Sequence, residues 1–249
     1  MSKAAFILWY KKTTKIDLQR NTLYNMHVRY ITSEVENHTF TRQLGAILKV
    51  WDDDNLTNTG YPLLMKNELD PFNQKSSNSF VDKVYRTCLV YNKNFPSSPE
   101  GGWITLENYP DRINDLVRNK IACKFIDGPE ILAKKIVELA EKNGLTANYS
   151  SRNYDDGYYA YHVYIVFPIH FDDGVGPVVV KNVSVEIQVS TQLKEVMYEI
   201  LHKFYADERS KIFQPDWKWD IHSLKFKSGY LAHTIHLLEA MIVEVRNKL

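Results

Sequence analysis

The segment Val183-Ser184-Val185-Glu186-Ile187-Gln188-Val189-Ser190 alternates apolar and polar residues without exception. Successive side chains of a β-strand point to opposite faces, so the pattern predicts a strand whose valines and isoleucine line one buried side. Glu186 and Gln188 then lie side by side on the other face. A carboxylate and an amide there indicate either a ligand site or a solvated sheet face, and this strand alone favours the solvated face.

Further strand and helix patterns precede this segment. Tyr158–Phe167 is rich in aromatic and β-branched residues, which is typical of a strand. Asn119–Phe125 and Leu145–Ser150 are two more expected strands, and the amphipathic segment Ile131–Asn143 between them, followed by Gly144, predicts a helix with a glycine C-cap. This order predicts a β-sheet of the α/β or α+β class.

Outside these strands we expect mainly helices. The spacing of apolar residues predicts one helix over Thr13–Val35 and two near the C-terminus, over Gln192–Ser210 and Gly229–Leu249. Trp51–Pro62 is rich in Asp, Asn, Gly and Pro, which predicts a loop. We therefore expect three segments: an N-terminal helical extension (1–65), a core (66–212) and a C-terminal helical segment (213–249).

The composition excludes several classes of protein. Lys and Arg total 31 against 30 Asp and Glu, and this balance does not indicate a general nucleic-acid or membrane binder. Cys88 and Cys123 lack the spacing of a zinc site or a disulfide framework. No apolar run approaches the roughly 18 residues of a membrane span, and the N-terminus lacks a signal-peptide cleavage pattern, so we expect a cytoplasmic protein.

A candidate anion site begins at Lys75. The caps at Ser76–Asn78 predict a helix that starts here and places Ser79, Lys83 and Arg86 on one face. Helix N-termini and cations both favour phosphate groups, so this face predicts a polyphosphate site. A solvated basic face is the commoner explanation of such a pattern when it stands alone.

A second candidate group lies on the aromatic strand. Tyr158 and His162 share a face by alternation, and a turn after this strand returns the chain toward Glu186 and Gln188. We therefore expect an aromatic ring, a histidine, an amide and a carboxylate to face one side of the sheet. Asp115, at the end of a short expected helix, is a further candidate carboxylate.

Taken in order, these segments resemble the synthetase domain of the RelA/SpoT-type alarmone synthetases, in particular the small stand-alone ones. Each segment alone is a weak signal, but their joint order and spacing is fairly specific. The resemblance extends over about residues 75–209 and is carried by four motifs: Lys75-x3-Ser79-x3-Lys83-x2-Arg86, Asp115-Leu116-Val117, Asp156-Gly157-Tyr158-x3-His162 and Val185-Glu186-Ile187-Gln188.

The resemblance implies an α+β fold, akin to nucleotidyltransferases, in which helices flank a mixed β-sheet. It also implies a pyrophosphokinase that transfers the β,γ-pyrophosphate of ATP to the 3′-hydroxyl of GDP or GTP, making (p)ppGpp with Mg²⁺. It implies that Asp115 and Glu186 hold the metal and that Glu186 also serves as base. The residues Lys75, Ser79, Lys83 and Arg86 would bind the ATP phosphates. Tyr158, His162 and Gln188 would bind the acceptor.

Three positions depart from the family pattern. Asn73 replaces an arginine that packs on adenine, Lys120 replaces a second arginine, and Val189–Thr191 replaces Ile-Arg-Thr. These changes leave two alternatives open: a toxin that pyrophosphorylates the 3′-CCA end of tRNA and pairs with an antitoxin protein, or a catalytically silent nucleotide-binding sensor. The family also includes homo-oligomers. No pattern matches the family's hydrolase domain, so product hydrolysis is not expected.

Overall fold

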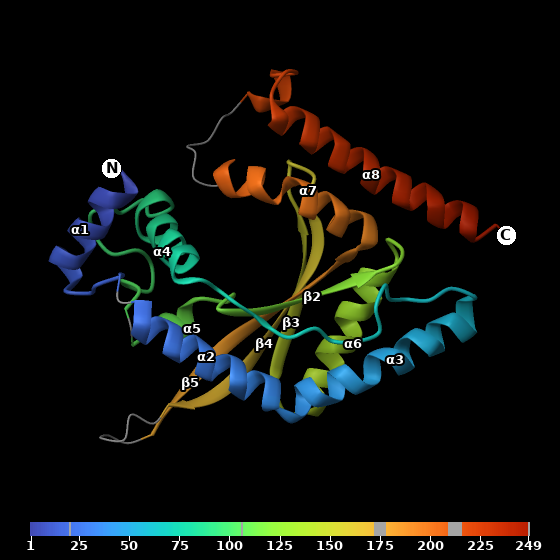
Figure 1. Cartoon of the computed structure of the whole chain (residues 1–249), viewed down its shortest axis with the longest axis horizontal. Coiled ribbons are helices and arrows are strands. Elements are labelled where there is room, and N and C mark those ends of the chain that lie inside the picture. The colour runs from blue at the N-terminus through green and yellow to red at the C-terminus, as the bar shows by residue number, and fades with distance from the viewer. Residues whose placement is uncertain (20, 106, 172–177, 209–215, 249) are drawn as a thin grey trace. The chain divides into compact units, whose positions relative to one another are not determined.

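A computed structural model of the chain describes residues 1–248 except 20, 106, 172–177 and 209–215 (Figure 1). Five strands form one sheet in the order β1-β2-β5-β4-β3, and helices accompany it, which confirms the predicted α+β class. The strands are β1 (Asn73–Gln74), β2 (Val117–Cys123), β3 (Thr146–Asn153), β4 (Tyr159–Phe171) and β5 (Val179–Thr191).

Helices make up most of the remaining structure. None of those within the described ranges is long and apolar enough to cross a membrane. A π-helical turn (Arg86–Val90) follows α4, and a 3₁₀ turn (Trp217–Trp219) precedes α8. The helices are α1 (Lys3–Thr14), α2 (Asn21–Asn37), α3 (Thr39–Thr59), α4 (Ser77–Tyr85), α5 (Tyr109–Arg112), α6 (Gly128–Lys142), α7 (Gln192–Glu208) and α8 (Leu224–Arg246).

The chain forms two compact units, and β2, β4 and β5 each contribute residues to both. Our three-segment division stays a prediction, and its boundary at residue 212 lies outside the described residues. Unit 1 consists of Met1–Thr41, Pro71–Asn119 and Tyr164–Glu186, and unit 2 of Arg42–Asp70, Lys120–Val163 and Ile187–Leu249.

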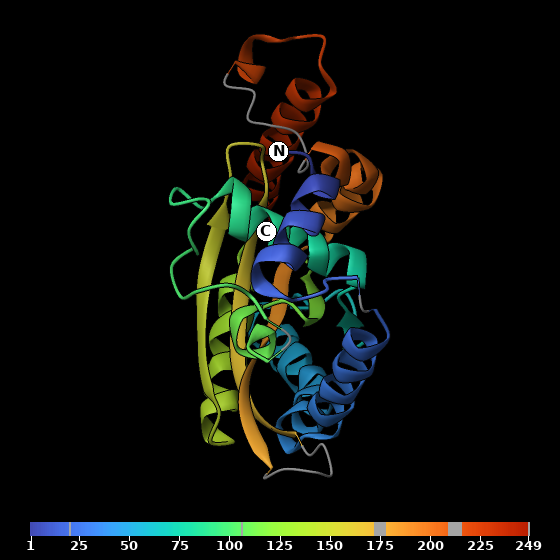
Figure 2. The same cartoon turned by 90° about the vertical axis from the view of Figure 1, so that its left-hand side faces the viewer.

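In unit 1, α1 packs beside α4 (Figure 2). The rings of Phe6 and Tyr85 join these helices at a centroid distance of 5.4 Å. The buried hydroxyl of Tyr10 donates a hydrogen bond to the carbonyl of Ile104 at 2.8 Å. Burial of large aromatic rings contributes much of the free energy of folding, so this aromatic packing anchors α4.

A second aromatic cluster fixes the start of α4. The rings of Tyr24 on α2 and Phe80 on α4 stack at 4.6 Å, and Phe80 meets Tyr109 edge-on at 5.3 Å. The Tyr24 hydroxyl donates to the backbone carbonyl of Lys75 at 2.8 Å. The backbone that presents Lys75 is therefore held by Tyr24 of α2, whose ring packs on Phe80 of α4.

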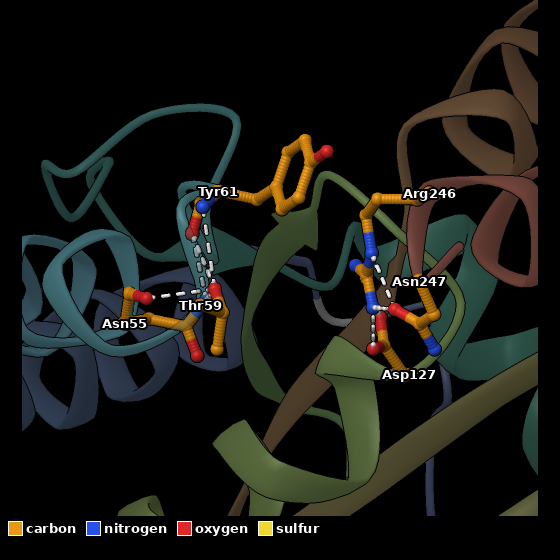
Figure 3. Close-up of polar contacts among 6 residues, drawn as sticks. All are labelled: Asn55, Thr59, Tyr61, Asp127, Arg246 and Asn247. Atoms are coloured by element: carbon orange, nitrogen blue, oxygen red, sulfur yellow. Dashed lines mark hydrogen bonds and ion pairs between the residues drawn. The ribbon is translucent and has the colours of Figure 1, made fainter. Parts of the chain in front are cut away.

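In unit 2, α6 packs on β3 and α7 lies beside α8 (Figure 1). The C-terminal end of α8 is fixed by Arg246, whose guanidinium donates to Asp127 at 2.6 Å (Figure 3). The same guanidinium lies 4.8 Å from the ring centre of Phe125 and 5.3 Å from that of Tyr61. Ion pairing and cation–π attraction thus both tie α8 to the start of α6.

Two local predictions were wrong. The expected helix Thr13–Val35 is divided, because α1 ends at a left-handed C-cap, Lys15, with φ 63°. The expected loop Trp51–Pro62 is largely helical, since α3 continues to Thr59. Its polar residues bind the returning chain: Asp52 accepts from the backbone N–H of Leu64 at 2.8 Å, which explains their presence in a helix.

Candidate functional site

Lys75 and Lys83 converge on the carboxylate of Asp115 in unit 1. The Nζ atom of Lys75 lies 2.7 Å from Oδ2, and that of Lys83 lies 2.7 Å from Oδ1. Lys75 follows β1, Lys83 is on α4, and Asp115 lies between α5 and β2. The exposed fractions of the three side chains are 9%, 30% and 18%, so water screens these ion pairs only partly. The structure brings together three of the predicted site residues.

Their pKa values reflect this arrangement. Burial opposes ionisation of Asp115, but the ammonium groups of Lys83 and Lys75 outweigh it and lower the pKa of the carboxyl to about 2. Burial also lowers the pKa of Lys75, and Asp115 partly offsets this effect. A buried lysine needs a negative partner, and Asp115 supplies it when no ligand is bound.

The predicted helix after Lys75 is confirmed as α4, and Ser76 is its N-cap. The Ser76 hydroxyl oxygen accepts from the backbone N–H of Ser79 at 3.2 Å, and the hydroxyl donates to the Ser79 Oγ atom at 2.9 Å. Ser79 is exposed at this helix N-terminus, where an anion is favoured. Arg86 lies at the other end of α4, where its Nε donates to the carbonyl of Asp82 at 3.4 Å.

Glu186 also belongs to unit 1, on β5. It is 6% exposed, so our preference for a solvated sheet face at this position was wrong. Burial of a carboxylate costs free energy unless polar groups or a ligand compensate its charge. Gln188, two residues along the same strand, belongs to unit 2.

Tyr158, directly before β4, and His162 on β4 meet in unit 2, as the alternation of residues 158–167 predicted. The Tyr158 hydroxyl and His162 Nε2 are 2.8 Å apart. Tyr158 ends a turn in which Gly157 has φ 82°, and its ring stacks on that of Tyr154 at 5.7 Å. The Tyr158 ring is therefore held at both its hydroxyl and its face.

The sequence reading missed Lys194. Its Nζ donates to the carbonyl of Gly157 at 2.6 Å and lies 5.1 Å from the centre of the Tyr158 ring. Burial lowers the pKa of Lys194 to about 8. A lysine in the first turn of α7 resembles any surface lysine, so only the packing of α7 on the turn could reveal its role.

Comparisons with known proteins place this geometry in context. No family model matches the chain, and no curated protein matches it in sequence. Small alarmone synthetase 1 from Bacillus subtilis, in a crystal structure with its product pppGpp, matches with a TM-score of 0.56 over 91% of this chain and 94% of that chain. The sequence identity is 17%. The chain has the small alarmone synthetase fold.

Two further solved structures agree. Small alarmone synthetase 2 from Bacillus subtilis matches with a TM-score of 0.52 and 14% identity, over 93% of this chain and 99% of that chain. A GTP pyrophosphokinase family protein from Streptococcus pneumoniae gives a TM-score of 0.51 and 17% identity over 83% and 87%. The predicted fold is thereby confirmed along most of the chain's length.

Within this small alarmone synthetase fold, the departures noted in the sequence occupy defined positions. Lys120 forms an ion pair with Glu195 at 3.1 Å and lies 3.7 Å from the ring centre of Tyr198. Asn73 is exposed on β1, directly opposite Arg118 on β2. Arg118 directly follows the Asp115-Leu116-Val117 motif and was not among the site residues predicted from the sequence.

The residues present are suited to the Mg²⁺ that the resemblance implies. Mg²⁺ takes hard oxygen ligands and commonly binds through one or two carboxylates together with substrate phosphates. The described part of the chain contains no group of three His, Cys, Asp or Glu that could hold a metal. Asp115 is ionised at neutral pH, but Lys75 and Lys83 occupy both its oxygens. Asp115 would be able to bind Mg²⁺ when phosphate oxygens take its place as partners of Lys75 and Lys83, so the residues fit a metal that binds together with the nucleotide phosphates.

Proposed function

We propose that this protein is a member of the RelA/SpoT family, a pyrophosphokinase that transfers the β,γ-pyrophosphate of ATP to the 3′-hydroxyl of GDP or GTP. The observation that carries the proposal is the convergence on Asp115 of Lys75, which precedes α4, and Lys83, which lies in the last turn of α4. Two cations that are largely withdrawn from solvent favour a polyphosphate, and the fold supports the same reading.

In the proposed reaction the 3′-oxygen of the acceptor attacks the β-phosphorus of ATP. A bond forms between these atoms, the bond between the β-phosphorus and the bridging oxygen of the α-phosphate breaks, and AMP leaves with that oxygen. Glu186 takes the hydroxyl proton. Lys75 and Lys83 stabilise the negative charge that moves onto the phosphate oxygens, which is the main source of catalysis in such transfers.

Other residues complete the proposed donor site. Ser79 offers a hydroxyl and the first turn of α4 offers backbone N–H groups, which bind phosphate oxygens. Arg86 would reach the phosphates only after its guanidinium leaves the Asp82 carbonyl. When bound, Mg²⁺ would neutralise phosphate charge, with Asp115 and Glu186 as its protein ligands.

The acceptor would bind through Tyr158, His162 and Gln188. A guanine base stacks on an aromatic face, and the Tyr158 ring is already fixed by its bond to His162 and by Lys194. His162 and Gln188 offer hydrogen-bonding groups that orient the acceptor. Such prior fixation lowers the entropy cost of binding.

The tRNA alternative is favoured by one observation. Lys120 forms an ion pair with Glu195 and a cation–π contact with Tyr198, and Asn73 has a short neutral side chain. Two arginine contacts that the family pattern leads us to expect are therefore missing. The change at Asn73 bears on the adenine of ATP, whereas Ser190 in place of the family arginine, two residues after Gln188, alters the proposed acceptor site, as a different acceptor such as the 3′ end of tRNA would require. An antitoxin partner, homo-oligomer formation and a cytoplasmic location stay predictions.

The deciding experiment incubates the purified protein with Mg²⁺ and ATP labelled on the γ-phosphate, offering GDP, GTP or deacylated tRNA in parallel. Label on GDP or GTP supports the alarmone synthetase, whereas label on tRNA alone supports the toxin. Label on none of them contradicts both and favours the sensor. Glu186→Gln is the matched variant: we expect it to lose product formation while ATP binding persists, and unchanged turnover would refute the role of Glu186.

A further inference from the structure

Arg118 lies across the β1–β2 ladder from Asn73 in unit 1. The two residues are paired in the antiparallel register, and the ladder continues as the backbone N–H of Lys75 donates to the carbonyl of Leu116 at 2.8 Å. Directly opposite residues and residues two apart on a strand share one face of a sheet. Asn73, Lys75 and Arg118 therefore face the same side.

On that face Arg118 and Lys75 are diagonal neighbours. Such positions have Cα atoms roughly 7–8 Å apart, within reach of long side chains, and like charges there repel each other. The charge of Arg118 is one of the causes that lower the pKa of Lys75, which agrees with this proximity. Arg118 thus adds a third cation beside Lys75, which shares Asp115 with Lys83.

Asp115 satisfies two of these cations but not the third. Its oxygens accept from Lys75 and Lys83. Among the residues that the structure describes, the guanidinium of Arg118 has no hydrogen bond or ion pair, although the residue is half-buried. A half-buried arginine with five unused donors beside another cation raises the free energy of the ligand-free protein, unless an anion binds.

We propose that Arg118 is a third phosphate-binding cation of the donor site and contacts the triphosphate of ATP directly. This inference rests on the proposed function, since it takes ATP as the ligand of the Lys75–Lys83–Asp115 cluster. A guanidinium presents paired N–H groups that match two phosphate oxygens. Contact with the triphosphate would relieve the repulsion between Arg118 and Lys75 and would use the free donors.

The test measures binding by calorimetry, independently of turnover, for Mg-ATP, inorganic tripolyphosphate and adenosine. We expect Arg118→Ala to weaken Mg-ATP and tripolyphosphate by roughly tenfold or more, the loss typical of a charge-assisted hydrogen bond to phosphate. Adenosine binding should not change. Arg118→Lys, which keeps the charge without the fork, should recover part of the affinity. Arg29→Ala, which removes an exposed arginine from α2 of the same unit, is the charge-matched control and should bind normally.

The melting temperature of the ligand-free variants separates a binding role from a structural one. Because Arg118 opposes Lys75, we expect Arg118→Ala to melt at the same temperature as the wild type or slightly higher. Unchanged tripolyphosphate affinity, weaker adenosine binding alone, or a lower melting temperature of Arg118→Ala would each overturn the proposal. If the wild-type protein binds neither Mg-ATP nor tripolyphosphate, the proposed function itself fails.

Discussion

The ammonium group of Lys75 and the carboxylate of Asp115 are 2.7 Å apart, and both side chains are largely withdrawn from solvent. A buried ion pair contributes little net stability compared with apolar packing, but loss of one partner leaves a buried charge without compensation. Removal of one partner is therefore expected to cost more free energy than the intact pair contributes.

Asp115→Asn should destabilise the protein by roughly 3 kcal/mol, because it leaves the buried ammonium of Lys75 without a negative partner. Urea unfolding followed by circular dichroism measures this cost. Asp82→Asn is the matched control, since Asp82 lies on α4 in the same unit and forms an exposed ion pair with Lys3. Its cost should stay below about 1 kcal/mol. Equal losses in both variants would show that Lys75 does not need Asp115.

The stability of the wild type should depend on pH through Asp115. Its pKa falls from 3.8 to about 2 on folding, so the carboxylate stabilises the protein above pH 4 and loses this contribution as the pH falls toward 2. The shift corresponds to about 2 kcal/mol. The difference in unfolding free energy between wild type and Asp115→Asn should therefore shrink between pH 5 and pH 2. A constant difference would contradict the assignment of this pKa to the lysine pair.

Gly157→Ala should damage the turn that carries Tyr158. A Cβ atom at Gly157 would lie 2.6 Å from the Cβ of Ala232 and 2.9 Å from the carbonyl oxygen of Gly229, both on α8. Gly144→Ala separates this clash from backbone strain, because Gly144 has a similar positive φ and no atom within 4 Å. We expect roughly 1–2 kcal/mol for Gly144→Ala, from strain alone, and a larger loss for Gly157→Ala.

The same pair of variants tests the acceptor role of Tyr158. If the proposed function holds, Gly157→Ala should raise the KM for the acceptor and leave the KM for ATP nearly unchanged. Gly144→Ala should change neither constant. An equal rise in both KM values for Gly157→Ala would indicate general damage and not displacement of the Tyr158 ring.

Arg246→Ala should loosen the C-terminal end of α8. The variant loses the ion pair with Asp127 and the contacts with the rings of Phe125 and Tyr61, which together cost roughly 2 kcal/mol. Arg246→Lys should recover only part of this, because an ammonium lacks the planar fork. Thermal unfolding measures both variants. A fully stable Arg246→Lys would show that charge alone holds the helix.

The elements with strong local signals could be predicted from the sequence. The cap at Ser76 and the spacing of Lys83 predicted α4, and strict alternation predicted β5. Both patterns involve residues that are close together in the sequence. The ion pairs of Asp115 could not be derived in this way. They join residues 40 and 32 positions apart, and only the packing of α2, α4 and α5 fixes that distance.

The wrong and missed predictions also arise from contacts between residues that are distant in the sequence. Asp52 and its polar neighbours predicted a loop, but tertiary hydrogen bonds from the returning chain allow them in a helix. Glu186 was judged more exposed than it is, since one strand does not show what covers its polar face. Lys194 and Arg118 were missed because a lysine or arginine at a helix start or on a strand carries no local mark of burial.

Asp115 also acts as an internal counterion. Polyanions that bind free surface lysines compete with dissolved ions, and their affinity therefore falls as the salt concentration rises. Lys75 and Lys83 share one carboxylate attached to the same chain, which offsets one of their two charges and whose local concentration does not depend on the buffer. An incoming polyphosphate exchanges with this tethered group, so its binding to the two lysines should weaken less with rising ionic strength than its binding to free surface lysines would.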